Sequence, residues 1–389
     1  DWQKFKIRLD CQWERLFTYL HALYGWQYDF FYTLERVLCS LVEYWLQRPP
    51  ELKLLDEKRQ VDPNWFLSEK VVGIVLYVDF FSDNLTKLKD HIPYFKKLDL
   101  NYLHLMPIFS VPLDDNDGGY AVSDYRAINP DLGTMSELSE LARRLREEGI
   151  SLALDFVFNH TSDEHEWAQR ARAGEEKYQN YYYIFADRDV PDMFEETMPE
   201  VFPETAPGNF TFDETMNKWV MTVFNDYQWD LNYGNPAVFT EMVDVILYWA
   251  NRGADIVRLD AVAFLWKEIG TNCIHRPQTH QVVKLFRDIL DICEPGVLIM
   301  TETNVPHDEN ISYFGHSDEA HMVYQFSLPP LLLHGLVSGD ASYLTRWAAG
   351  LGNLPDHCTY FNFTASHDGI GVRPLQGIIP DEELNELAE

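Results

Sequence analysis

Apolar and polar positions follow two different spacings along this chain of 389 residues. In the first part, apolar residues recur every three or four positions through WERLFTYLHALYG and FFYTLERVLCSLVEYWL, until Pro49-Pro50 ends the run. That period is typical of amphipathic helices, and proline cannot continue one. The pattern predicts helices over residues 1 to about 57 and, with the residues that follow, an N-terminal helical domain over residues 1–70.

From Val71 onward, short apolar runs alternate with amphipathic helical stretches, which is typical of strand–helix units with a parallel sheet. Seven runs predict seven strands: VVGIVLYV, NYLHLMP, ISLALDFVF, ADIVRLDAV, GVLIMTET, AHMVYQF and CTYFNFTAS. Before the third run, SELSELARRLREEG predicts a helix that begins with a capping box of Thr134 and Glu137 and ends at Gly149. The predicted fold class is α/β.

The pattern contains no eighth strand, although a (β/α)8 barrel needs one. The last residues, DEELNELAE, have the pattern of a seventh helix. We interpret the chain as a fragment of a TIM barrel whose C-terminal part is absent; the alternative is that the helical module conceals a strand. The barrel is expected over residues 71–389, incomplete after strand seven. Residues 162–219, between the third and fourth strands, exceed an ordinary loop and predict an inserted domain.

The composition of the chain argues against some classes of binding partner. The chain has 62 acidic against 31 basic residues, a net charge of -31, which argues against nucleic acid and suits a neutral small-molecule substrate. No apolar run is long enough to span a bilayer, and no signal segment is visible, although a trimmed N-terminus would hide one. Five widely spaced cysteines without metal-type spacing are expected to be reduced packing residues. We therefore expect a cytoplasmic protein without nucleic-acid or membrane partner, cofactor or metal.

Polar or charged residues close four of the predicted strands, where barrel enzymes hold their catalytic groups. They are Asp155, Asn159 and His160 in the third, Arg258 and Asp260 in the fourth, Glu302 in the fifth, and His367 and Asp368 in the seventh. Each acid alone would more often be a helix cap or an ion-pair partner. Three acids at successive strand ends favour a shared site. Asn159 and His160 could also bind a metal, but two ligands are weak evidence for one.

Several carboxylates in one apolar pocket suit retaining glycoside chemistry, which needs a nucleophile and an acid about 5 Å apart. A third anion can favour the cationic transition state. Arg258 lies two residues before Asp260, on the same strand face, and is expected to keep Asp260 ionised as the nucleophile. Glu302 ends an apolar strand, so loss of water should raise its pKa, as a general acid requires.

Four motifs, DFVFNH, DIVRLDAVAF, TETN and FTASHDGIG, resemble in order the four conserved regions of the α-amylase family, glycoside hydrolase family 13. The resemblance covers about Val71 to Pro374. It implies a (β/α)8 barrel with the long third loop as domain B. It also implies that Asp260 is the nucleophile, Glu302 the acid/base and Asp368 the stabiliser of the transition state.

The same resemblance implies a sugar-binding role for five further residues. These are Arg258, His160, His367 and, in the motif DGGY, Asp117 and Tyr120. Asp117 corresponds to the acid that holds the donor glucose. Tyr120 corresponds to the aromatic platform on which an apolar sugar face stacks.

Different segments of the chain resemble different branches of the family. The N-terminal helices, NYLHLMPIF and DGGYAVSDYR resemble amylosucrases and sucrose hydrolases, which implies transfer or hydrolysis of glucose from sucrose. In contrast, TETNVPHDENISYFG and HDGIGVRPL resemble the sucrose-phosphorylase-related branch, and Gly369 stands where amylosucrases usually have an aspartate.

The main interpretation is a sucrose-active enzyme. One alternative is a sucrose or glucosylglycerate phosphorylase that releases glucose 1-phosphate, with Arg373 a candidate phosphate ligand or simply a surface arginine. The other is an inactive binding paralogue, although all three acids are present.

Overall fold

The structure is a computed structural model that describes residues 2–388. Seven strands form one parallel sheet in chain order: β1 (Gly73–Leu76), β2 (Tyr102–Leu105), β5 (Ser151–Val157), β11 (Ile256–Asp260), β12 (Leu298–Thr301), β13 (Met322–Tyr324) and β14 (Thr359–Phe361). Each lies within one of the seven predicted runs, so the predicted strands are confirmed. Within the described residues, β1 and β14 each pair on one side only.

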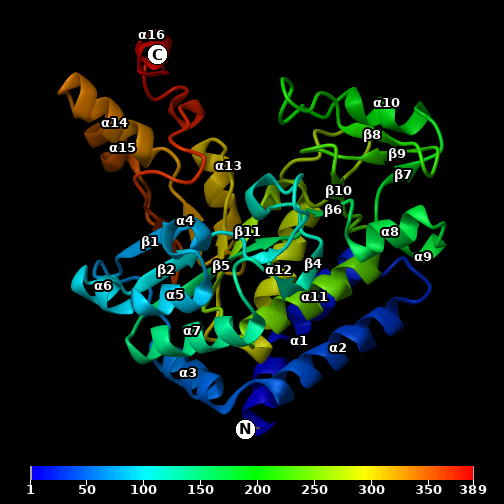
Figure 1. The fold of residues 1–389 in the computed structure, drawn as a ribbon, viewed down its shortest axis with the longest axis horizontal. Coiled ribbons are helices and arrows are strands. Elements are labelled where there is room, and N and C mark those ends of the chain that lie inside the picture. Colours follow the sequence, from blue (N-terminus) through cyan, green and yellow to red (C-terminus); the bar gives the residue numbers. More distant parts are fainter. Residues whose placement is uncertain (1, 389) are drawn as a thin grey trace.

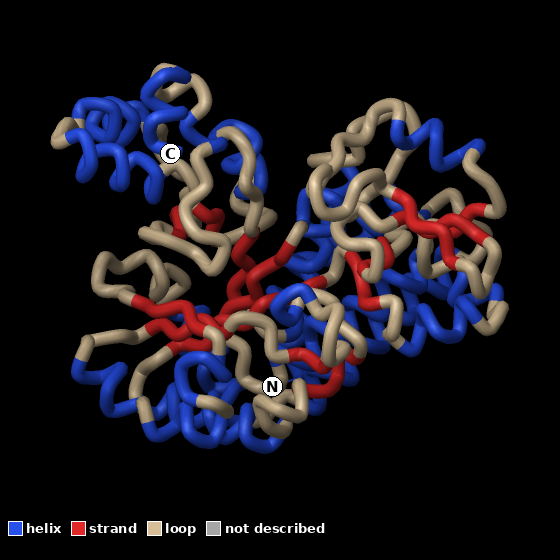
Figure 2. The backbone as a smooth tube through the Cα atoms, turned by 45° about the horizontal axis from the view of Figure 1, so that its top comes forward, coloured by secondary structure: helices blue, strands red, loops and turns tan. Residues whose placement is uncertain are grey.

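The sheet curls into part of a barrel, and helices cover its outer face (Figures 1 and 2). The helices around it are α4 (Val78–Ser82), α5 (Leu85–Asp90), α6 (Ile92–Lys97), α7 (Met135–Glu147), α11 (Pro236–Ala250), α12 (Pro277–Cys293) and α13 (His307–Ile311). The predicted capping box of α7 is present, since Thr134 and Glu137 each accept a backbone N–H from the other's residue. This arrangement is a (β/α)8-type barrel, as predicted.

Three N-terminal helices cover one side of the barrel: α1 (Trp2–Tyr24), α2 (Phe30–Gln47) and α3 (Pro50–Val61). α1 packs on α12 and α2 on α11, and their apolar residues belong to the same core as the barrel helices. Arg48 forms a buried ion pair with Asp56, and Arg59 pairs with Asp255 at the start of β11, at 2.7 Å. The helical layer is therefore fastened to the barrel, and the boundary at residue 70 stays a prediction.

Between β5 and α11 the chain forms a separate lobe. Its elements are β6 (His160–Ser162), α8 (Glu166–Arg172), α9 (Glu176–Gln179), β7 (Ile184–Phe185), α10 (Asp189–Glu195), β8 (Phe210–Asp213), β9 (Lys218–Met221) and β10 (Gln228–Asp230). β7, β9 and β8 make a small antiparallel sheet over an apolar cluster that includes Phe194 and Phe210. We propose that residues 162–219 of this lobe are the predicted inserted domain.

The remaining elements lie at the carboxyl end of the sheet. β3 (Phe109–Ser110) and β4 (Asp124–Ile128) form a short antiparallel pair in the loop after β2. After β13, α14 (Leu328–Ser338), α15 (Ser342–Gly350) and α16 (Asp381–Ala388) form another lobe, at the top of Figure 1.

Membrane and cysteine predictions can be compared with the structure directly. Of the helices in the described part of the chain, none is long and apolar enough to cross a membrane. All five cysteines are free, as predicted, and Cys273, Cys293 and Cys358 are buried. Cys11 and Cys39 are exposed, so their expected role as packing residues is wrong: both lie on helix faces that point away from the barrel.

Candidate active site

Alternation along the strands places charged side chains inside the barrel. Successive residues of a strand point to opposite faces, so Ile256, Arg258 and Asp260 of β11 share one face, and Ile256 belongs to the apolar cluster inside the sheet. Arg258 lies beside Asp155 of β5 in the sheet register. Glu302 follows directly after β12, and its backbone N–H donates to a carbonyl of β11 at 3.2 Å. The interior of the barrel is therefore apolar around Ile256 and charged at the carboxyl ends of the strands.

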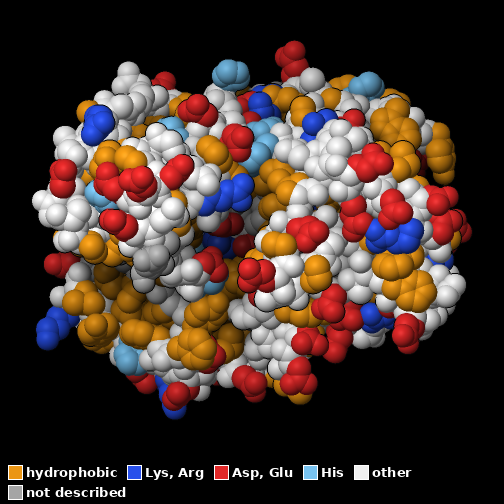
Figure 3. All heavy atoms as spheres, turned by 90° about the horizontal axis from the view of Figure 1, so that it is seen from above, with side chains coloured by type: hydrophobic (Ala, Val, Ile, Leu, Met, Phe, Trp, Pro, Cys, Tyr) orange, Lys and Arg blue, Asp and Glu red, His pale blue; other side chains and the backbone are white. Residues whose placement is uncertain are grey.

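Arg258 is the centre of the charged group. Its guanidinium forms an ion pair with Asp155, lies 2.8 Å from Oδ1 of Asp260, and lies 3.8 Å from Oε2 of Glu302. The Arg258 side chain is 3% exposed, whereas those of Asp260 and Glu302 are 14% and 18% exposed. Because both carboxylates approach one guanidinium, they share one pocket. Figure 3 views the molecule from above relative to Figure 1 and shows a hollow near its middle, with acidic and basic side chains in and around it.

Burial and the positive charge of Arg258 together determine the pKa values of the three carboxylates around it. Burial raises the pKa of Asp155, but Arg258 and His104 outweigh it and lower the pKa overall; Nε2 of His104 lies 3.1 Å from the Asp155 carboxylate. Burial raises the pKa of Asp260 to about 8 and also raises that of Glu302, against the opposing effect of Arg258. The prediction for Glu302 is confirmed in direction. Arg258 acts on Asp260 in the predicted direction, because it lowers the pKa, but burial and the neighbouring carboxylates outweigh it, so the Asp260 pKa is raised overall.

The residues expected to hold the donor sugar border the same pocket. The Tyr120 hydroxyl lies 3.3 Å from Nη1 of Arg258 and 3.2 Å from Nε2 of His367. The rings of Tyr120 and His367 are stacked, with centroids 5.5 Å apart. Asp117 lies three residues before Tyr120, with a left-handed φ of 51°, and its Oδ2 accepts a hydrogen bond from Gln228 at 3.0 Å. A cavity of about 940 Å³ lies between the edge strands β1 and β14 and reaches Arg258 and His367.

His160 is buried, and polar groups surround both of its ring nitrogens. Burial lowers its pKa to about 4, so the ring is neutral and carries one proton. Lys267 donates to Oδ1 of Asn159 at 3.1 Å, which turns the Asn159 amide nitrogen toward Nδ1 of His160, at 3.3 Å. Nε2 lies 3.2 Å from the carbonyl oxygen of Tyr120 and 3.1 Å from the amide nitrogen of Gln228, so each ring nitrogen faces a side-chain amide nitrogen. His160 thus holds the backbone of the expected aromatic platform.

Asp368 is placed differently from the other two acids. It lies in the loop after β14, its side chain is 69% exposed, and its Oδ1 lies 3.2 Å from Nε2 of His367. Among residues 2–388 it makes no ion pair with Arg258. Its negative charge nevertheless contributes to the raised pKa of Glu302, so it lies within electrostatic range of the pocket.

Two residues of the segment QWDLNY, residues 228–233, contact the site, although this segment was not among the predicted site residues. Gln228 is fully buried, and its amide nitrogen lies 3.0 Å from Asp117 and 3.1 Å from Nε2 of His160. Asp230 pairs with Lys267 at 2.7 Å, with neither side chain exposed. Phe224, just before this motif, has its ring centroid 5.1 Å from that of His160. The available signal was a polar pair, Gln228 and Asp230, within an otherwise apolar segment.

The fold and site together define a parallel α/β barrel with an acidic pocket at the carboxyl ends of its strands. The chain matches the family model described as alpha amylase, catalytic domain, over residues 79–343. The protein therefore belongs to the α-amylase family, as its four motifs suggested. The catalytic and sugar-binding roles of individual residues stay predictions.

Curated relatives fall into two groups. A glucosylglycerate phosphorylase of Spirochaeta thermophila is 45% identical over 289 residues, which is 74% of this chain and 47% of that protein. The glucosylglycerate phosphorylase of Escherichia coli is 39% identical over 345 residues, covering 87% and 58%. A trehalose synthase/amylase of Mycolicibacterium smegmatis is 32% identical over 336 residues, covering 84% and 55%. The chain thus spans about half the length of the curated relatives it matches.

Among solved structures, sucrose 6F-phosphate phosphorylase from Thermoanaerobacter thermosaccharolyticum superimposes with a TM-score of 0.69. The superposition covers 82% of this chain and 64% of that one, at 23% identity. At this identity the likeness supports the barrel fold alone.

Proposed function

We propose that this chain carries the catalytic barrel of a retaining glucosyl phosphorylase, which cleaves an α-glucoside of the glucosylglycerate type with phosphate and releases glucose 1-phosphate. The observation that carries the proposal is the 45% and 39% identity to two proteins named glucosylglycerate phosphorylase, over most of this chain. Transfer or hydrolysis of glucose from sucrose, the main interpretation of the sequence, takes second place, because the relatives favour the phosphorylase alternative.

In the first half-reaction, a carboxylate oxygen of Asp260 attacks the anomeric carbon of the glucoside. The bond from that carbon to the glycosidic oxygen breaks, and the proton of Glu302 moves to the departing oxygen, which leaves as an alcohol. The product is a glucosyl ester on Asp260. The loss of one ring substituent with its electron pair makes the sugar transiently cationic, and the negative charge of Asp368 stabilises it.

In the second half-reaction, Glu302 is ionised and accepts the proton of a phosphate hydroxyl as that oxygen attacks the anomeric carbon. The ester bond breaks, the Asp260 carboxylate is restored, and α-glucose 1-phosphate leaves. Two inversions at one carbon retain its configuration.

This sequence of steps needs Asp260 ionised and Glu302 protonated at the start. The raised pKa values of both groups mean that the pair holds a shared proton near neutral pH. Arg258 lies closer to Asp260, at 2.8 Å, than to Glu302, at 3.8 Å. The nearer carboxylate gains more from the positive charge, so the shared proton resides on Glu302. Arg258 thereby assigns the two roles.

Phosphate needs a cationic or N–H-rich site beside the anomeric carbon. Arg258 is committed to carboxylates, so the acceptor requires another cation. Arg373, the candidate from the sequence, is exposed at the start of the short turn Arg373–Leu375, in the segment that follows Asp368. No ion pair of its side chain is found in the described part of the chain, which leaves the guanidinium available to an anion.

The test compares glucosylglycerate, sucrose and trehalose as donors, each with and without phosphate, and measures glucose 1-phosphate and free glucose. We expect glucose 1-phosphate from glucosylglycerate only when phosphate is present. Free glucose from sucrose at equal rates without phosphate would favour the sucrose-active alternative instead. No product from any donor would favour the inactive paralogue.

A matched pair of variants ties the activity to the pocket. Asp260→Asn removes the nucleophile and should abolish turnover, whereas Asp131→Asn changes an exposed aspartate outside the pocket and should leave the rate unchanged. Equal rates in parent and Asp260→Asn would contradict the assigned role.

A further inference from the structure

Helix α2 carries a second, partly exposed apolar stripe beside its buried side. The side toward the barrel is buried and carries Thr33, Leu34, Val37, Ser40, Leu41 and Trp45. The other side carries Phe31, Leu38, Val42 and Leu46, spaced seven, four and four residues apart as on one helical face, and Phe31 and Leu46 are 74% and 63% exposed. An exposed apolar stripe that is bordered by polar residues is typical of an interaction surface. The outer side therefore needs a partner.

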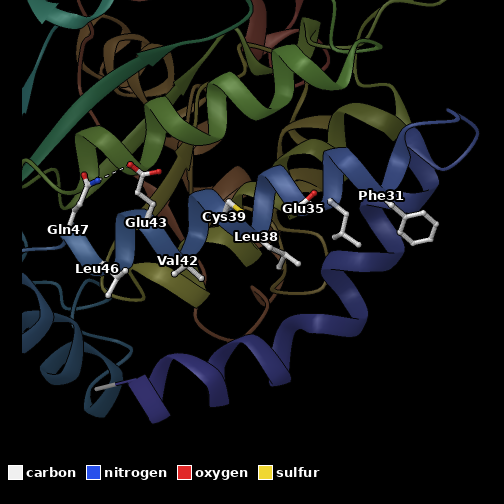
Figure 4. Close-up of a pocket in the computed structure, with 9 residues that line it drawn as sticks. Phe31, Glu35, Leu38, Cys39, Val42, Glu43, Leu46 and Gln47 are labelled. Atoms are coloured by element: carbon white, nitrogen blue, oxygen red, sulfur yellow. Dashed lines mark hydrogen bonds between the residues drawn. The ribbon is translucent and has the colours of Figure 1, made fainter.

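A groove of about 730 Å³ follows this outer side. Its lining comes entirely from α2, and Figure 4 shows it running from Phe31 at one end to Leu46 near the other, with Cys39 between them. Glu35 and Glu43 lie at its sides. α1 diverges from α2 beyond their common turn, so the space beside α2 stays open.

The exposed apolar area is close to what a stable dimer buries. Beside the groove, the turn between α1 and α2 and the first turn of α2, together called the aromatic turn, carry four exposed aromatic residues: Trp26 (77%), Tyr28 (101%), Phe31 (74%) and Tyr32 (63%). A fully buried aromatic residue contributes about 200 Å², so these four expose roughly 600 Å². A stable interface buries about 800 Å² per partner and is rich in Trp and Tyr. The groove and this aromatic turn together supply that area.

We propose that this groove is the self-association surface of the protein and binds α2 of a second copy, antiparallel, about a two-fold axis. Phe31 and Leu46 lie equally far along the helix from the point between Leu38 and Cys39. An axis at that point places Phe31 of each copy on Leu46 of the other, so that one apolar stripe covers its own equivalent. Two-fold dimers with self-matching patches are the commonest protein assemblies. The proposal is independent of the proposed function.

The charges on the stripe give this dimer a signature. In the antiparallel pairing, Glu35 of one copy lies near Glu43 of the other, and each copy carries a net charge of -31. Salt screens like charges, so the dimer should tighten as salt rises. A basic helical partner on the same groove would instead be released by salt. Glu43→Lys should tighten the dimer about twofold or more, because the introduced ammonium group would face Glu35 of the other copy.

Sedimentation velocity of the 389-residue chain, from nanomolar to high micromolar concentration and in low and high salt, measures the association. We expect a monomer–dimer equilibrium. Phe31→Glu and Leu46→Glu, both at well-exposed positions that should not impair folding, should each weaken it about tenfold or more. Leu113→Glu, at a 91% exposed position on another surface, should leave it unchanged. Circular dichroism shows that each variant is folded.

Oxidation provides a second readout, because Cys39 would lie next to its equivalent at the axis. Mild oxidant should produce a covalent dimer that Cys39→Ser abolishes and Cys11→Ser retains. A chain that stays monomeric at every concentration and salt overturns the proposal. So does a dimer that survives both glutamate variants, or one linked through Cys11 in place of Cys39.

Discussion

Removing the ammonium group of Lys267 should destabilise the protein strongly. Nζ of Lys267 lies 2.7 Å from Oδ2 of Asp230 and 3.1 Å from Oδ1 of Asn159, and it also donates to the carbonyl of Phe264. These contacts join β10, the end of β5 and the loop after β11. Both members of the ion pair have fully buried side chains. Lys267→Met keeps most of the apolar length of the side chain and removes only its charge.

The expected loss of stability depends on the Asp230 carboxylate, which stays buried when Lys267 is replaced. Removing one partner of a buried ion pair costs about 3–5 kcal/mol, because the other charge stays buried without compensation. Asp230 would keep two hydrogen bonds, from the backbone N–H of Val223 at 3.1 Å and from Asn159 at 3.3 Å. We therefore expect a loss near the lower end, about 3 kcal/mol.

Urea denaturation followed by tryptophan fluorescence measures the free energy of unfolding of Lys267→Met against the parent. Lys97→Met, at an exposed lysine, is the control and should change it by less than about 0.5 kcal/mol. Adding Asp230→Asn to Lys267→Met should restore part of the loss, since the stranded charge is then gone. A loss below about 1 kcal/mol for Lys267→Met would refute this reasoning.

Three further predictions concern pH and charge. The rate should fall above pH about 8, because the shared proton of Asp260 and Glu302 is then lost. With an α-glucosyl fluoride, which needs no acid, the initial burst of fluoride release by Glu302→Gln should show no such fall. Asp155→Asn should lower the rate at least about tenfold, because Arg258 loses its ion-pair partner. The variant should also lose activity at a lower pH than the parent, since removing a neighbouring negative charge lowers the pKa of Asp260. An unchanged pH profile would count against this. Burial raises the pKa of Glu294 to about 8 in the folded state, from 4.5. The folded protein therefore holds a proton that the unfolded chain loses, and stability should fall by about 1.4 kcal/mol per pH unit between those values. Denaturation of Glu294→Gln across this window should show a flatter decline, and parallel curves would contradict it.

The order of the strands could be predicted because each carries its own local signal. Runs such as ISLALDFVF are apolar, short and bounded by helical patterns, and all seven lie in the sheet. The spacing of Arg258 and Asp260 by two residues also predicted that both charges point to the same face of one strand. Both features depend only on near neighbours in the sequence.

The protonation state of the pocket could not be predicted in this way. The sequence shows Arg258 two residues from Asp260, but not that Asp155, 103 positions away, forms an ion pair with the same guanidinium. Gln228 likewise reaches Asp117 across 111 positions. A pKa depends on every charge and on the burial around the group, and these are set by tertiary packing.

The most direct test of the account is to identify the residue that carries the sugar. Glu302→Gln is treated with an α-glucosyl fluoride in the absence of phosphate, digested, and analysed by peptide mass spectrometry. Fluoride leaves without a proton, and the variant lacks the base for the second half-reaction, so the covalent intermediate should accumulate. We predict one glucosyl unit on Asp260. A glucosyl unit on any other residue, or none while the parent enzyme turns over the same fluoride, would contradict the account.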